Sequence, residues 1–143
     1  MSRYRKGLPQ LSGELFLTDA GIETDLIFNH GIEIREFATH TLLADPRGRE
    51  AMADYFRAFL ALASEHRTGF ILDSQTWKAH MHWADDLGAS EADLRAANLD
   101  SIDFLSELRE SVVAMQREVV SGASLLMSLA EIFLCLCKIA AQN

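Results

Sequence analysis

Two short apolar runs that each end in an aspartate constrain the fold of this chain most strongly. Residues 15–19 read Leu-Phe-Leu-Thr-Asp, and residues 69–73 read Gly-Phe-Ile-Leu-Asp. A continuous apolar run of this length is typical of a strand that is buried on both faces of a sheet. A helical segment separates the two runs, so the order predicts a βαβ unit with two parallel strands.

Two long helices are predicted between and after these strands. The first begins with Asp45 as N-cap and Pro46 at the first helical position, and it continues to about His66. The second follows Ser90 and Asp93, which together resemble a capping box. Their apolar stripes are Ala51, Tyr55, Phe59 and Leu62 in the first helix, and Leu94, Ala97, Leu105, Leu108, Val112 and Met115 in the second.

The alternation of strands and helices predicts an α/β fold, with the chemistry at the C-terminal ends of the strands. Residues 118–122 are expected to open a third strand. With 143 residues, 49% of them hydrophobic, the chain is long enough for one domain with a core. Lys and Arg number 13 against 21 Asp and Glu, a net charge of −8, which argues against a nucleic-acid partner.

The C-terminal residues differ in composition from the rest of the chain. From Ala123 to Ala141 only Glu131 and Lys138 are charged. We therefore divide the chain into a domain over residues 1–122 and an apolar helical tail over residues 123–143. A membrane span is not expected there, because each charge at a span centre costs about 2.5 to 3.5 kcal/mol.

The two cysteines are Cys135 and Cys137, a number too small for a disulfide-stapled secreted domain. On a helix they face different sides, so we expect buried, inert thiols rather than metal ligands. The basic N-terminus lacks the apolar core of a secretory signal, and a cytoplasmic location is therefore expected.

Residues 16–26 (Phe-Leu-Thr-Asp-Ala-Gly-Ile-Glu-Thr-Asp-Leu) and residues 73–80 (Asp-Ser-Gln-Thr-Trp-Lys-Ala-His) together resemble the N-terminal half of the homocysteine S-methyltransferase family. In that family an Asp-Gly-Gly-x-x-Thr-x-Leu signature ends the first barrel strand, and a Thr-aromatic segment ends the second. The resemblance extends from about Leu15 to Gly122. It implies the N-terminal portion of a (β/α)8 TIM barrel, incomplete and followed by the divergent tail.

The resemblance implies methyl transfer to a thiol such as homocysteine. The family holds zinc through three cysteine thiolates, and the substrate thiol becomes the fourth ligand and a nucleophilic thiolate. The implied partners are a small thiol amino acid and a methyl donor. The zinc cysteines lie in later barrel strands that this sequence does not contain, and a full barrel needs about 250 residues. The expectation is therefore a truncated, inactive member of the family.

Substrate binding is what the resemblance implies for six residues: Asp19, Ala20, Gly21, Thr24, Gln75 and Thr76. Ala20 stands where the family has the first glycine of its signature. Taken alone, the residues leave alternatives open. Asp19 also suits a loop-holding acceptor of backbone N–H groups, Gly21 and Thr24 suit a turn and a helix cap, and Gln75 and Thr76 suit hydrogen bonds within their loop.

The neighbouring residues favour structural roles. Glu23 and Asp25 are expected to be solvated loop charges, and Trp77 is expected to serve packing. His80 and His82 are two residues apart, a spacing that converges on one metal only in an extended segment, so we expect no metal site there.

A rival hypothesis is a non-catalytic interaction module. Unpaired strand edges offer free backbone N–H and C=O groups to another chain. In this hypothesis the chain self-associates through open sheet edges, and the tail pairs with another copy.

Overall fold

A computed structural model describes residues 9–11, 13–119 and 126–128 of the chain. Three short strands form a parallel sheet in the order β1 (Phe16–Thr18), β2 (Gly69–Leu72) and β3 (Leu126–Ser128). Phe16 lies opposite Gly69, and Phe70 lies opposite Leu126. The prediction that the first two apolar runs lie side by side in the same direction is confirmed.

The two longest elements are the helices α2 (Pro46–Glu65) and α4 (Glu91–Val119). Asp45 caps α2 by accepting a hydrogen bond from the Gly48 N–H at 2.8 Å. At the start of α4, the Asp93 N–H donates to Ser90 Oγ at 3.2 Å and the Ser90 N–H donates to Asp93 Oδ2 at 2.9 Å. Both predicted helix starts are confirmed, because each depends on contacts within one turn.

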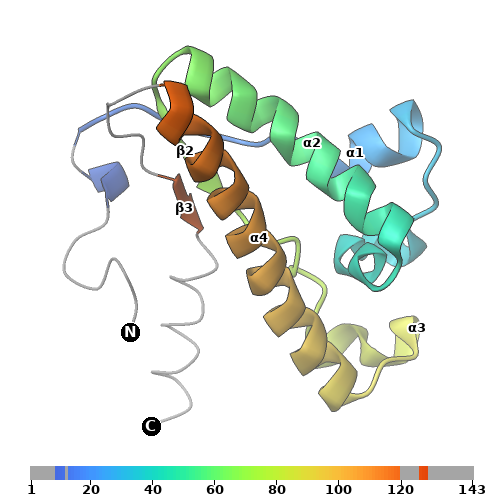
Figure 1. The fold of residues 1–143 in the computed structure, drawn as a ribbon. Coiled ribbons are helices and arrows are strands. Elements are labelled where there is room, and N and C mark those ends of the chain that lie inside the picture. The colour runs from blue at the N-terminus through green and yellow to red at the C-terminus, as the bar shows by residue number, and fades with distance from the viewer. Residues whose placement is uncertain (1–8, 12, 120–125, 129–143) are drawn as a thin grey trace, which may run out of the picture.

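The connections between these elements are short helical turns. They are α1 (Ile22–Thr24), α3 (Ala84–Leu87), a π-helical turn over Asp25–Asn29, and 3₁₀ turns over Pro9–Leu11, Arg35–Phe37, Thr39–Ala44 and Met81–Trp83. Figure 1 shows the turns that directly precede α2 around the N-terminal end of that helix, with the sheet near its other end. None of the helices in the described ranges combines the length and apolar character that crossing a membrane requires.

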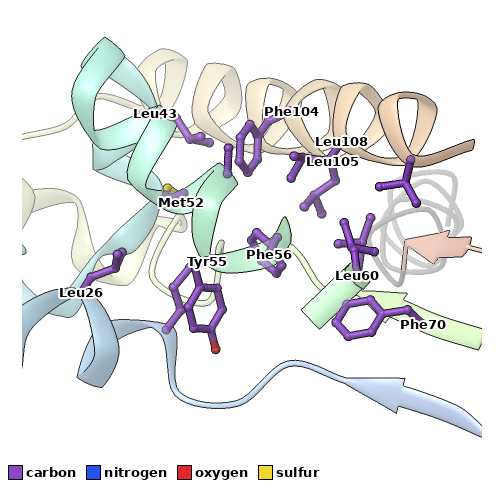
Figure 2. Packing of buried hydrophobic residues seen from close by; sticks show 14 of the residues in the cluster. Leu26, Leu43, Met52, Tyr55, Phe56, Leu60, Phe70, Phe104, Leu105 and Leu108 are labelled. Carbon is purple, nitrogen blue, oxygen red and sulfur yellow. The ribbon is translucent and has the colours of Figure 1, made fainter. Parts of the chain in front are cut away.

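The core lies mainly between α2, α4 and the turns around them (Figure 2). Phe56 of α2 is fully buried, with its ring centroid 6.4 Å from that of Phe104 on α4. The sheet adds the buried Phe70 and Leu72 of β2, while Gly69 and Ile71 between them are only half-buried. Alternate burial along β2 means that the helices cover one face of the sheet.

The predicted α/β fold, built as the N-terminal portion of a (β/α)8 barrel, is wrong. Most of the described residues are helical, and the strands are only three, four and three residues long. In a barrel the strand side chains fill the interior in layers. Here the helices and turns supply nearly all the buried apolar side chains, and the sheet is a small addition to a helical core.

The expected third strand is also misplaced. Glu118 and Val119 belong to the end of α4, and the third strand lies at Leu126–Ser128, within the segment predicted to be a helical tail. A helical pattern of apolar residues continues through the end of α4, and pairing with β2 decides where the strand forms. Cys135 and Cys137 lie outside the described residues, as does the rest of the tail beyond Ser128.

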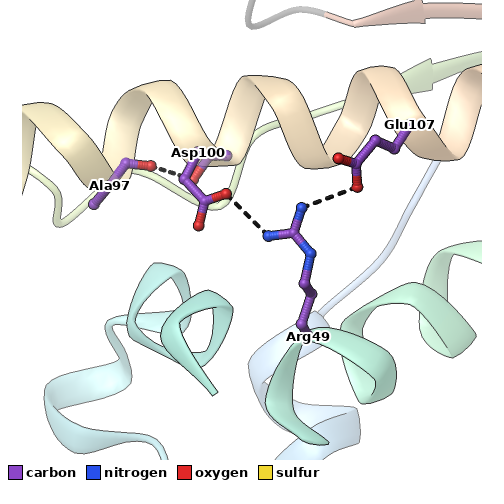
Figure 3. Close-up of polar contacts among 5 residues, drawn as sticks. Arg49, Ala97, Asp100 and Glu107 are labelled. Carbon is purple, nitrogen blue, oxygen red and sulfur yellow. Dashed lines mark hydrogen bonds and ion pairs between the residues drawn. The ribbon is translucent and has the colours of Figure 1, made fainter. Parts of the chain in front are cut away.

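Arg49 joins the two long helices (Figure 3). Its guanidinium contacts Asp100 at 2.9 Å and Glu107 at 3.0 Å, both on α4. The same guanidinium carbon lies 5.1 Å from the centroid of the Phe104 ring. The planar guanidinium can therefore bind two carboxylates and stack on an aromatic ring at once, which a lysine ammonium cannot do.

Candidate functional site at the carboxyl edge of the sheet

Asp19 follows β1 directly, and Asp73 follows β2 directly. Because the two strands are parallel neighbours, both aspartates lie at the carboxyl edge of the sheet. Burial, then the charge of Asp73 and, to a smaller extent, that of Glu23 raise the pKa of Asp19 to about 6. Desolvation also raises the pKa of Asp73, although that residue is exposed. We refer to Asp19 and Asp73 as the carboxyl pair.

Tyr55 of α2 reaches Asp19 from the side of the core. Its hydroxyl accepts a hydrogen bond from the Ala20 N–H at 3.1 Å and donates to Asp19 Oδ2 at 3.4 Å. Figure 2 shows this hydroxyl pointing out of the core toward the segment that follows β1. Burial raises the pKa of Tyr55 to about 12, so the hydroxyl stays protonated. Asp19 therefore faces a neutral hydrogen-bond donor.

Glu23 connects three segments that are far apart in the sequence. Its Oε1 accepts hydrogen bonds from Thr39 Oγ1 at 2.8 Å and from the Trp77 indole Nε1 at 3.3 Å. Glu23 is half-buried, so its prediction as a solvated loop charge is wrong. Asp25 makes only local contacts, with Asn29 Nδ2 at 2.7 Å and His30 Nε2 at 3.3 Å.

Lys78 is buried next to two tryptophans. Its ammonium lies 3.7 Å from the centroid of the Trp83 ring and 4.7 Å from that of Trp77. It also donates a hydrogen bond to the Glu36 carbonyl oxygen. Cation–π contacts of this kind are strongest where water is excluded. Together with Glu23, Lys78 ties the loop after β2 to the turns that precede α2.

The loop after β2 holds the other two predicted site residues of that segment. Gln75 Nε2 donates to the Asp73 carbonyl oxygen at 3.4 Å, and Thr76 Oγ1 lies 3.0 Å from Ser74 Oγ. The Thr76 carbonyl accepts from the Ala79 N–H at 2.8 Å. Both side chains are half-buried at the same sheet edge as Asp19, and their hydrogen bonds are made within the loop.

Unlike Asp19, the other three predicted residues after β1 occupy exposed positions. Ala20 is exposed and contributes its N–H to Tyr55. Gly21 has φ −94° and ψ 84°, and a Cβ there would lie 3.4 Å from Thr24 Oγ1, an ordinary contact. Thr24 ends α1 and is exposed. Backbone conformation alone therefore does not require glycine at position 21.

His80 and His82 have stacked rings with centroids 6.1 Å apart. The described residues contain no group of three or more His, Cys, Asp or Glu side chains that could hold a metal ion. At the carboxyl edge, the charges of Asp73 and Glu23 both act on Asp19.

Sequence reasoning missed the contributions of Tyr55, Lys78 and Asp73. Tyr55 was read only as part of an apolar helix stripe. Its phenol oxygen is the signal that could have found it, since a buried tyrosine hydroxyl usually has a hydrogen-bond partner. Asp73 follows an apolar run in the same way as Asp19, so the symmetry of the two runs pointed to it.

Comparisons of the chain with protein-family models, with curated proteins and with solved structures found no match.

Proposed function

We propose that this chain binds a thiol amino acid such as homocysteine at the carboxyl edge of β1 and β2, and that it is a homocysteine S-methyltransferase-like protein. The single observation that carries the binding proposal is the carboxyl pair, in which two aspartates follow adjacent parallel strands and the charge of Asp73 acts on the half-buried Asp19. The methyl transfer and the thiol come from the sequence resemblance through residues 16–26 and 73–80.

An ammonium group is the ligand chemistry that suits this pair. Two neighbouring carboxylates repel each other when both are ionised, and a cation between them relieves that repulsion. The α-ammonium of an amino acid also offers three N–H donors to the carboxylate oxygens. Asp19 would accept from the ammonium, Asp73 would balance its charge, and Gln75 and Thr76 lie on the same edge.

Zinc is the metal that the resemblance implies, and the described residues do not fit it. A zinc site of this family needs three thiolates, whereas the described ranges contain no cysteine and no group of three metal-ligating side chains. The proposal therefore assigns substrate binding to the described residues and derives no chemical step through zinc. A cytoplasmic location is part of the same proposal.

The proposal is tested by isothermal titration calorimetry at pH 7.5 with L-homocysteine and with N-acetyl-L-homocysteine under reducing conditions. The Asp19→Asn variant should bind L-homocysteine about tenfold or more weakly, because charge-assisted hydrogen bonds are worth roughly 1.5 to 3 kcal/mol. Acetylation removes the ammonium and should weaken binding to the unmodified chain by a similar factor.

Asp103→Asn is the matched control, because it makes the same change of charge at an exposed position on α4. It should bind L-homocysteine as the unmodified chain does. Equal affinities of Asp19→Asn and the unmodified chain, or equal affinities for the free and acetylated amino acids, would contradict the proposal.

The interaction module remains a second candidate because of one observation. Among the described residues β1 pairs with β2 alone, and Leu15 beside it is 65% exposed. Such an edge can pair with another copy of the chain. Size-exclusion chromatography with light scattering tests this second candidate function. A stable dimer would support it, and a monomer of 15.9 kDa at high protein concentration would oppose it.

A further inference from the structure

Tyr55 stands out because a helix side chain inside the core reaches the candidate site. Its ring packs against Phe56 with a centroid distance of 5.4 Å and against Phe59 at 5.0 Å, and the residue is only 8% exposed. These contacts leave the ring little freedom. The position of the hydroxyl is therefore set by the packing of α2, not by the exposed segment that it contacts.

The two hydrogen bonds of the hydroxyl define its orientation. A backbone N–H can only donate, so the bond from the Ala20 N–H uses a lone pair of the phenol oxygen. The phenol proton is then free to point at Asp19 Oδ2. The oxygens of an ionised carboxylate have no proton to donate, so in this bond the hydroxyl is the donor. One carboxylate oxygen of Asp19 is thus engaged from the core side.

We propose that Tyr55 is a positioning residue that holds Asp19 by Oδ2 and leaves Oδ1 to the ammonium of the ligand. This inference rests on the proposed function for the identity of the ligand. The hydrogen bond from Tyr55 to Asp19 is present without a ligand. A carboxylate that is fixed before binding loses less side-chain freedom when the ligand arrives.

The groups that face Asp19 define how its titration responds. Asp73 follows β2, Glu23 belongs to α1, and Tyr55 approaches from α2. Asp73 and Glu23 raise the pKa of Asp19, whereas the hydrogen bond from Tyr55 lowers it, and Asp25 also acts on Tyr55. Removal of the hydroxyl alone should therefore move the titration of Asp19 upward.

Tyr55→Phe is the direct test, because it removes the hydroxyl and keeps the ring. We expect L-homocysteine to bind about three- to tenfold more weakly at pH 7.5, the loss of one hydrogen bond to a charged group. We also expect the pH midpoint of binding, and the NMR titration of the Asp19 carboxyl in the ligand-free chain, to rise by about half a unit. Ser101→Ala removes a different buried hydroxyl, one on α4 that donates to the Ala97 carbonyl oxygen, and should move neither midpoint.

The ligand-free titration keeps this inference separate from the proposed function. Suppose that the midpoint of the Asp19 titration rises in Tyr55→Phe but that no variant binds L-homocysteine. This result would support the positioning of Asp19 by Tyr55 and contradict the proposed ligand. An unchanged Asp19 midpoint would overturn the inference whatever the binding result. So would a loss of affinity that is equal in Tyr55→Phe and Ser101→Ala, because that result would assign the loss to a general effect on the core and not to the hold on Asp19.

Discussion

Asp19 is a residue whose charge the folded protein disfavours. Its pKa is raised from 3.8 to about 6, chiefly by burial and next by Asp73. Between these two values the folded state binds more protons than the unfolded state, so stability falls as pH rises through this window and stays lower above it. An acid whose ionised form destabilises the folded chain is a candidate functional group.

Asp19→Asn should therefore stabilise the chain at pH 7.5 while it weakens ligand binding. The full shift of the Asp19 pKa corresponds to about 3 kcal/mol of unfolding free energy. Solvent screens a half-buried group, so the expected gain in the free energy of unfolding is about 1 to 2 kcal/mol. Urea denaturation at pH 7.5 and at pH 3.5 measures it, and the gain should disappear at the lower pH. A variant that is less stable than the unmodified chain at pH 7.5 would refute this account of Asp19, and Asp103→Asn controls for the change in net charge.

His40 makes the opposite contribution to the pH dependence of stability. The residue is 6% exposed, its Nδ1 has no hydrogen-bond partner among the described residues, and burial lowers its pKa. As pH falls below the ordinary value of 6.5, the unfolded state takes up a proton before the folded state, so stability falls.

Replacing His40 by Leu should remove the loss of stability at low pH. It should also raise the free energy of unfolding at pH 7.5 by about 1 kcal/mol, because it removes a buried nitrogen that has no hydrogen-bond partner among the described residues. Denaturant unfolding at pH 7.5 and pH 5 measures both effects. His66→Leu, at an exposed position at the end of α2, is the control for the replacement of an imidazole by a leucine side chain. The account of His40 fails if His40→Leu loses as much stability between these pH values as the unmodified chain.

At the residue scale, the sequence predicted Asp19 correctly as an end-of-strand acid but could not predict its surroundings. The hydrogen bond from Tyr55 spans 36 positions, and the Trp77 bond to Glu23 spans 54. Contacts over such separations depend on the tertiary arrangement and leave no periodic pattern in the sequence. For this reason the sequence alone predicts a solvated charge at Glu23.

At the scale of single elements, the start of α2 depends on a close approach of two backbones. A Cβ on Gly48 would lie 2.6 Å from the Leu42 carbonyl oxygen and 3.0 Å from Leu42 Cβ. The turn over Thr39–Ala44 therefore packs against the first turn of α2 only because position 48 has no side chain.

Gly48→Ala should destabilise the chain by about 1 to 3 kcal/mol, the usual range for overpacking. Gly21→Ala is the control, since its Cβ would make only an ordinary contact at 3.4 Å. Thermal unfolding of the two variants under the same conditions makes the comparison. If Gly21→Ala lowers the melting temperature as much as Gly48→Ala, the close approach is not the reason for glycine at position 48.

The elements that the sequence predicted well are those that local chemistry determines. The N-cap at Asp45 and the capping box at Ser90 and Asp93 act within one helical turn, and both helices start where expected. The third strand depends on pairing with β2, about 55 residues away in the register Phe70 with Leu126. Its position at Leu126–Ser128 could not be obtained from residues 118–122 alone.

At the scale of the whole molecule, the parallel pairing of β1 and β2 was predictable and the architecture was not. Apolar runs indicate that a segment is buried, but they do not say which elements dominate the core. In this chain α2 and α4 supply most of the buried side chains, and β2 supplies Phe70 and Leu72. The carboxyl edge survives this correction, because it needs only two parallel neighbours.

The most direct test of the amino-acid site is an NMR titration of the assigned Asp19 carboxyl carbon, with and without L-homocysteine. Without ligand, Asp19 should titrate near pH 6, since burial and Asp73 disfavour its ionised form. With saturating ligand, the ammonium should lower that midpoint by about one unit or more, because an opposite charge within hydrogen-bond distance favours the carboxylate. A midpoint that is the same with and without L-homocysteine would contradict the assignment of Asp19 as the group that binds the ammonium.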